Sequence, residues 1–171
     1  SQTALFMAIE NENIEFVNGL LNYKNIDANI MNESSSEYYQ FKTSEKISCL
    51  FLATEYENFE ITKLLLNNSE LDINCLNETS SNDGYEANRT KKTAFYLAVK
   101  SKNIELIKLF LNNKKLDVNI SNEFYYEDKF NESQTKSETI TAIELAKDKR
   151  EIYLTITEKL KMRECSTNDF P

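Results

Sequence analysis

The chain repeats itself at a period of 45 residues, from Thr3 to Ser48 and from Ser48 to Thr93. Each copy opens with a hydroxyl residue, followed by a small residue, a large apolar residue, an aromatic residue and, two positions on, an alanine. An Asp-x-Asn triplet recurs at the same place in each of the three copies, and a shorter fourth copy begins at Thr141. Self-similarity at a fixed period of this length indicates stacked supersecondary units rather than one globular core.

Each unit contains two short amphipathic segments. In the second unit, Leu50 and Ala53 belong to the first segment, and Ile61, Leu64 and Leu65 to the second. Apolar residues at i, i+3 and i+4 predict one buried face of a helix. The hydroxyl residue at the start of each unit stands where its oxygen can cap the first helix. About eighteen polar residues without this period then lead to the next unit, and we expect them to form extended β-hairpin or finger loops that project from one edge.

These units predict an all-α repeat solenoid of about three and a half units. We place one repeat domain at residues 1–164, with units at about 1–45, 46–90 and 91–138 and a capping unit at 139–164. The fourth unit is rich in charge, as a terminal repeat requires, because no neighbour covers its outer face. We expect residues 165–171 to form a disordered tail. The chain opens directly on a first-helix motif, so we expect it to be part of a longer protein.

The unit resembles the ankyrin repeat, whose signature reads T-P-L-H-x-A, a turn, a Leu/Val-rich helix and D-V-N. In the third unit, residues 93–98, 104–109 and 117–119 fit this pattern in order and spacing. The period would also suit HEAT or armadillo repeats, but those need longer helices than the Asn-rich segments leave room for. The ankyrin period is about 33 residues, so each unit here carries about 12 more, located after Asp-x-Asn where the ankyrin hairpin finger lies.

Three positions depart from the ankyrin signature. The proline is replaced by Ala4, Cys49 and Ala94. The histidine is replaced by an aromatic residue in every unit, and the glycine of the inter-helix turn is replaced by Glu12, Glu57 and Lys102, each followed by asparagine. Asp83-Gly84 reads as the tip of a β-hairpin, where this dipeptide favours a type I′ turn.

Composition argues against catalysis and against nucleic acid as a partner. The chain has no histidine and only two glycines, which removes the commonest general base, the commonest metal ligand and any glycine-rich phosphate loop. Its net charge of −8 opposes binding to DNA, RNA or an anionic membrane. Three cysteines without C-x-x-C spacing predict free thiols in a reducing compartment. We therefore expect neither an enzyme nor a cofactor.

The resemblance implies a non-catalytic, cytoplasmic module for protein–protein interaction, or scaffold, acting as a monomer. The alternative is a regulatory or targeting segment of a larger multidomain enzyme whose catalytic part lies outside this chain. Ankyrin arrays bind through a concave surface made by the first helices and the fingers. Carried over by position, the resemblance implies partner-binding residues on both parts: Glu10, Glu55, Tyr56 and Lys100 on the helices, and Tyr38, Tyr39, Phe41, Tyr85, Phe124, Tyr125, Tyr126 and Phe130 on the fingers.

The third finger is the longest and most acidic of the three, and it carries four of these aromatic residues. An acidic loop rich in aromatic residues suits a partner with a basic surface, because charge steers the encounter and aromatic rings supply buried area. A second interpretation stays open: the aromatic residues pack finger against finger and stiffen the long hairpins.

Overall fold

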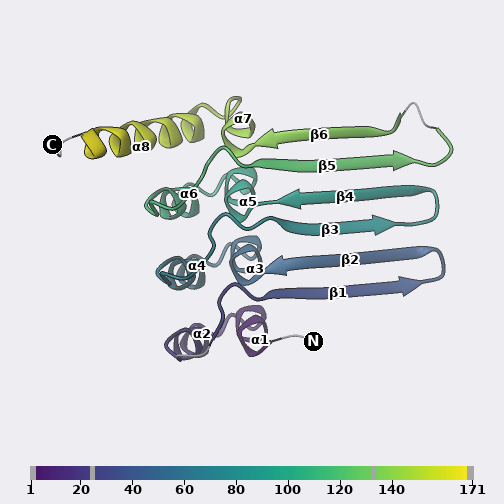
Figure 1. Cartoon of the computed structure of the whole chain (residues 1–171), viewed down its shortest axis with the longest axis horizontal. Coiled ribbons are helices and arrows are strands. Elements are labelled where there is room, and N and C mark those ends of the chain that lie inside the picture. The colour runs from purple at the N-terminus through teal and green to yellow at the C-terminus, as the bar shows by residue number, and fades with distance from the viewer. Residues whose placement is uncertain (1–2, 24–25, 132–133, 169–171) are drawn as a thin grey trace.

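Four helix pairs stack in one column, and a hairpin projects from the column between each pair and the next (Figure 1). The computed structural model describes residues 3–23, 26–131 and 134–168, with side chains described as far as residue 163. The first helices of the pairs are α1 (Ala4–Glu10), α3 (Cys49–Glu55), α5 (Ala94–Ser101) and α7 (Ala142–Ala146). The second helices are α2 (Ile14–Leu21), α4 (Phe59–Leu66), α6 (Ile104–Leu111) and α8 (Arg150–Asn168).

The prediction of an all-α solenoid is wrong, because the fingers form one continuous sheet. Finger 1 is β1 (Met31–Tyr38) and β2 (Phe41–Ser48), finger 2 is β3 (Asn77–Asn82) and β4 (Glu86–Lys92), and finger 3 is β5 (Ser121–Asp128) and β6 (Lys136–Thr141). The six strands pair antiparallel in sequence order, so β2 pairs with β3 and β4 with β5 across successive fingers. The extra residues of each unit therefore lengthen hairpins that pair with one another, and this pairing across units makes the all-α description wrong.

The helix starts follow the sequence pattern. Thr3, Ser48 and Thr93 each accept a backbone N–H three residues on, and Thr141 does the same within a capping box with Glu144. A side-chain oxygen at this position satisfies a donor that the helix leaves without a partner. The caps predicted at Thr3, Ser48 and Thr93 are confirmed, and Thr141 forms a fourth.

The inter-helix turn takes the left-handed conformation without glycine. Glu12, Glu57 and Lys102 have φ of 51°, 53° and 62°. This region is costly for a side chain with a Cβ atom, which explains why ankyrin repeats favour glycine there. The two glutamates also accept a bond from the next unit: Asn58 Nδ2 donates to Glu12 Oε2 at 3.0 Å, and Asn103 Nδ2 to Glu57 Oε2 at 2.9 Å. A glycine could not make this contact.

Asparagines of the Asp-x-Asn triplets also link neighbouring units. Asn29 accepts the backbone N–H of Asp72 and donates to the carbonyl of Glu70. Asn74 repeats both bonds one unit on, with Asp117 and Lys115. These bonds fix the vertical register of the column, since each side chain reaches only the corresponding turn of the next unit.

The hairpin of finger 2 forms at Asp83-Gly84 as predicted, but its turn is not type I′. Type I′ needs positive φ at both central residues. Here Gly84 alone has positive φ in the turn, at 90°, and Asp83 Oδ1 instead accepts the backbone N–H groups of Tyr85 and Glu86.

The C-terminal unit closes the column. Arg163 on α8 donates to the backbone carbonyls of Leu111 and Asn113 at the end of α6, which are among the acceptors that a helix end leaves open. Helix α8 extends through residues 165–168, which the sequence analysis placed in the tail, and residues 169–171 lie outside the described residues.

Candidate partner-binding surface

The finger sheet has two faces, because successive side chains of a strand point to opposite sides. We call one the inner face: it carries Phe124 and Lys92, and Phe124 lies against Tyr96 of α5, with ring centres 5.6 Å apart. Lys92 Nζ lies 5.5 Å from the centre of the same ring. The opposite side is the outer face. The contact with Tyr96 shows that the inner face adjoins the first helices of the column.

Four predicted residues lie where the first helices end. Glu10, Glu55 and Lys100 are exposed on α1, α3 and α5, and Tyr56 is 46% exposed at the C-cap of α3. The pKa of Lys92 is lowered, chiefly by partial burial and further by the charge of Lys100, while Glu55 opposes this shift. The helix ends and the inner face of the sheet therefore share one electrostatic environment.

Exposed aromatic rings gather at the tips of all three fingers. Tyr38, Tyr39 and Phe41 surround the turn of finger 1, and Tyr39 is 84% exposed with a positive φ of 54°. Tyr38 and Tyr39 stack edge to face. Tyr85 of finger 2 and Phe130 of finger 3 lie 5.5 Å apart between ring centres, and both stay exposed. The tips thus combine ring contacts with large accessible apolar area.

The four aromatic residues predicted on finger 3 do not form one cluster. Phe124 is half-buried against Tyr96, and Tyr126 is half-buried on the inner face. A hydrogen bond to Glu86 raises the pKa of the Tyr126 hydroxyl. Tyr125 points to the outer face, and Phe130 lies beyond the end of β5. Strand alternation therefore separates residues that are adjacent in the sequence.

The outer face carries a row of alternating charge that the sequence analysis missed. Glu33, Lys46, Glu78, Lys91 and Glu123 face one another across five consecutive strands. Lys46 Nζ lies 2.7 Å from a carboxylate oxygen of Glu33. Lys91 Nζ lies 3.7 Å from a carboxylate oxygen of Glu78 and 3.7 Å from one of Glu123. The hydrogen bond from Lys46 is the main cause that lowers the pKa of Glu33. The available signal was a glutamate at the same place in each of the first three units, followed thirteen residues later by Lys46, Lys91 or Lys136. In the third unit the register differs, so that Lys136 faces Tyr126 rather than Glu123.

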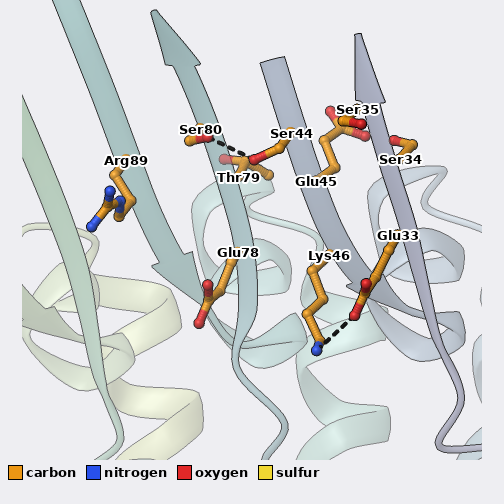
Figure 2. Close-up of a pocket in the computed structure, with 10 residues that line it drawn as sticks. All are labelled: Glu33, Ser34, Ser35, Ser44, Glu45, Lys46, Glu78, Thr79, Ser80 and Arg89. Carbon is orange, nitrogen blue, oxygen red and sulfur yellow. Dashed lines mark hydrogen bonds and ion pairs between the residues drawn. The ribbon is translucent and has the colours of Figure 1, made fainter. Parts of the chain in front are cut away.

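An open depression of about 770 Å³ lies over part of this row, and Glu33, Lys46 and Glu78 are among the residues that line it (Figure 2). The hydroxyls of Ser44 and Ser80 are 2.8 Å apart across β2 and β3. Arg89 stands beside them on β4 and, among the described residues, has no ion-pair partner. Because most outer-face charges are paired with each other, this face offers little net charge to a ligand.

Two features are absent from the part of the chain that the structure describes. Among the residues that the structure describes, no group of three or more histidine, cysteine, aspartate or glutamate side chains is placed to hold a metal ion. Over the same part of the chain, no helix is long and apolar enough to cross a membrane.

Comparison with known proteins adds the family. A family model described as ankyrin repeats matches residues 5–122 in three copies. A crystal structure of EF0377, an ankyrin repeat protein, shares 16% sequence identity with a TM-score of 0.36, and the alignment covers 92% of this chain and 96% of that chain. Comparison with curated proteins gives no match.

Proposed function

The chain belongs to the ankyrin repeat family, and we propose that it is a non-catalytic module that binds a partner protein through the inner face of its finger sheet, the fingertips and the exposed ends of the first helices. Ankyrin repeats generally mediate protein–protein interaction. The residues in question are those that the resemblance implies on the inner side and at the tips.

The fingertips carry this proposal. Tyr38, Tyr39, Phe41, Tyr85 and Phe130 are all exposed, although aromatic rings of this size normally gain stability from burial. Exposed aromatic residues that cluster on a rigid support are the type that supplies most of the binding energy at protein interfaces. The stacked strands below them provide the support.

The partner is proposed to present a basic surface. The chain has a net charge of −8, and Asp83, Glu86 and Asp128 lie near the tips of fingers 2 and 3. Complementary charge raises the rate of encounter and excludes acidic competitors. The thiols of Cys49 and Cys75 are free, which suits a reducing compartment such as the cytoplasm, where we propose that the module acts.

The test compares two exposed rings of the proposed binding surface with one ring on the outer face. Tyr56→Ala removes a ring at the end of α3, and Phe130→Ala removes one at a fingertip, whereas Tyr125→Ala removes a 38% exposed ring from the outer face as the control. Each of the first two changes should lower the amount of a partner captured from cell extract by at least about fivefold. Quantitative mass spectrometry of the captured proteins gives the readout, and melting temperatures establish that all variants are folded.

The proposal is wrong if Tyr125→Ala loses the captured protein while Tyr56→Ala and Phe130→Ala keep it. That outcome would place the interaction on the outer face.

A further inference from the structure

A pocket of about 240 Å³ opens on the inner face between fingers 1 and 2, near their tips. Its walls come from three strands and one turn: Phe41 and Thr43 on β2, Ser81 on β3, Asp83 in the turn, and Glu86 and Asn88 on β4. Neighbouring strands lie about 4.8 Å apart, so β2 and β4 are separated by about 10 Å with Ser81 between them. Ser81 therefore forms a small floor between the ring of Phe41 on one side and the carboxylates of Asp83 and Glu86 on the other.

The pocket exists because of one residue difference between repeats. Ser81 on β3 and Tyr126 on β5 occupy the same position of successive units. In finger 3 the Tyr126 ring is half-buried, and Glu86 on the neighbouring strand raises the pKa of its hydroxyl. In finger 2 the side chain is a hydroxymethyl group, which leaves the space beside Phe41 open. A tyrosine at this position is thus compatible with the sheet.

The charge of the pocket is negative. Asp83 accepts two backbone N–H groups through Oδ1, at 2.9 and 2.7 Å, and these bonds lower its pKa, so it is ionised at neutral pH. Glu86 is exposed at the opposite wall. Lys42 also borders the pocket, but its ammonium group lies 2.7 Å from Glu37 on the outer face. This cation of β2 is therefore already paired on the other side of the sheet. Lys129 of finger 3 lies at the edge of the pocket, where its Nζ donates to Oδ1 of the lining residue Asn82 at 3.0 Å.

An aromatic face opposite carboxylates selects one class of group. A guanidinium or ammonium ion is attracted to the face of a ring and forms charge-assisted hydrogen bonds with carboxylates. We propose that this pocket receives a cationic side chain, arginine or lysine, of the partner protein. The inference rests on the proposed function and specifies the type of side chain of the partner that this pocket would bind. The outer face contrasts with it, because there each glutamate of the charge row already faces a lysine. Figure 2 shows one such pair, Glu33 with Lys46.

The experiment uses the whole chain and a minimal probe. A capped Gly-Arg-Gly peptide is titrated into isotope-labelled protein, with Gly-Gln-Gly as the neutral control, and amide shifts are followed by two-dimensional NMR. The arginine peptide should move the amide signals of Ser81, Glu86 and Asn88 in a saturable way. The glutamine peptide should leave them in place.

Two matched substitutions test the location. Ser81→Tyr fills the pocket with the residue that the next unit carries, and it should weaken peptide binding by about tenfold or more. Ser80→Tyr is the control: it lies on the adjacent outer face, and Tyr125 occupies its position in the next unit. It should leave binding unchanged. Glu86→Gln should weaken binding severalfold without closing the pocket.

The inference is overturned if the arginine peptide moves no signals of the pocket, if its effects spread over the outer face, or if Ser81→Tyr binds as well as the wild type. The partner-capture test uses Tyr56 and Phe130, which do not line the pocket. Capture that survives Ser81→Tyr but not Tyr56→Ala would thus remove the pocket proposal and keep the proposed function.

Discussion

The helical column and the finger sheet are built from the same units but are stabilised in different ways. The column buries a continuous apolar cluster in which Phe6, Leu65 and Phe110 have no exposed surface. Beyond its base, β1 and most of β2 are exposed on both faces. Backbone pairing, cross-strand ion pairs and a few buried asparagines hold the fingers together. The fold thus places its apolar stabilisation away from the surface that is proposed to bind.

The largest effect is expected in the column. Leu65→Ala on α4 should lower the free energy of unfolding by about 2–5 kcal/mol, because neighbours on both sides cannot close the cavity fully. Phe41→Ala in finger 1 removes a larger side chain that is 59% exposed, and it should cost less than about 1 kcal/mol. Urea denaturation monitored by circular dichroism measures both. Equal costs would mean that the fingers have a packed core of their own.

The next effect is expected where the fingers leave the column. Asn77 is fully buried, accepts the backbone N–H of Ser48 at 2.6 Å, and donates to the carbonyls of Cys75 and Lys92. Asn77→Ala leaves these groups without partners and should cost about 1–3 kcal/mol. Asn32 holds the same position in the first unit but is only half-buried, so Asn32→Ala should cost clearly less. Similar losses for the two variants would show that the buried bonds contribute nothing beyond the side chain's own contacts.

A third effect is expected on the stability of the column at alkaline pH. Burial is the main cause that raises the pKa of the Cys49 thiol from 9.0 to about 12. Because the folded-state pKa is the higher one, the thiol contributes stability below about pH 9 that is lost as the pH rises toward about 12. Cys49→Ala, the residue found at this position in the first and third units, removes that loss.

At about pH 10, the wild type should have lost about 1–2 kcal/mol more stability than Cys49→Ala, relative to neutral pH. Urea midpoints of both proteins across this range give the comparison, since the other titrating groups are common to both. Parallel pH profiles would show that Cys49 is accessible to water in the folded protein.

The smallest effects are expected at the two glycines, with opposite signs. Gly19 lies within α2, where an added Cβ would meet no atom within 4 Å, so Gly19→Ala should stabilise by about 0.5–1 kcal/mol. Gly84 has φ of 90°, and an added Cβ would lie 2.7 Å from Oε1 of Gln40 in finger 1. Gly84→Ala should destabilise by about 1 kcal/mol. If Gly84→Ala stabilised the protein, the Gln40 side chain and the turn of finger 2 would have to rearrange at little cost.

Sequence patterns gave reliable information where the chemistry is local. A hydroxyl residue directly before an apolar helical pattern predicts a cap, and the three predicted caps at Thr3, Ser48 and Thr93 formed. The aromatic residues were correctly placed in the fingers, but their distribution between faces was not recognised: Tyr125 and Tyr126 are neighbours in the chain and point in opposite directions. That distribution follows from strand alternation, which could be applied only once the bounds and register of the strands were known.

The period and order of residues determined the family, the helix pairs and their caps, because these depend on contacts within a few positions of the chain. The sheet was decided only by the tertiary structure. Finger 1 reads MNESSSEY and FKTSEKIS, with no apolar alternation from which to identify a half-buried strand. Packed helices lie about 8–10 Å apart, which is close to two strand spacings of about 4.8 Å. Each stacked unit therefore brings its hairpin to pairing distance from the next, so the column forms the sheet.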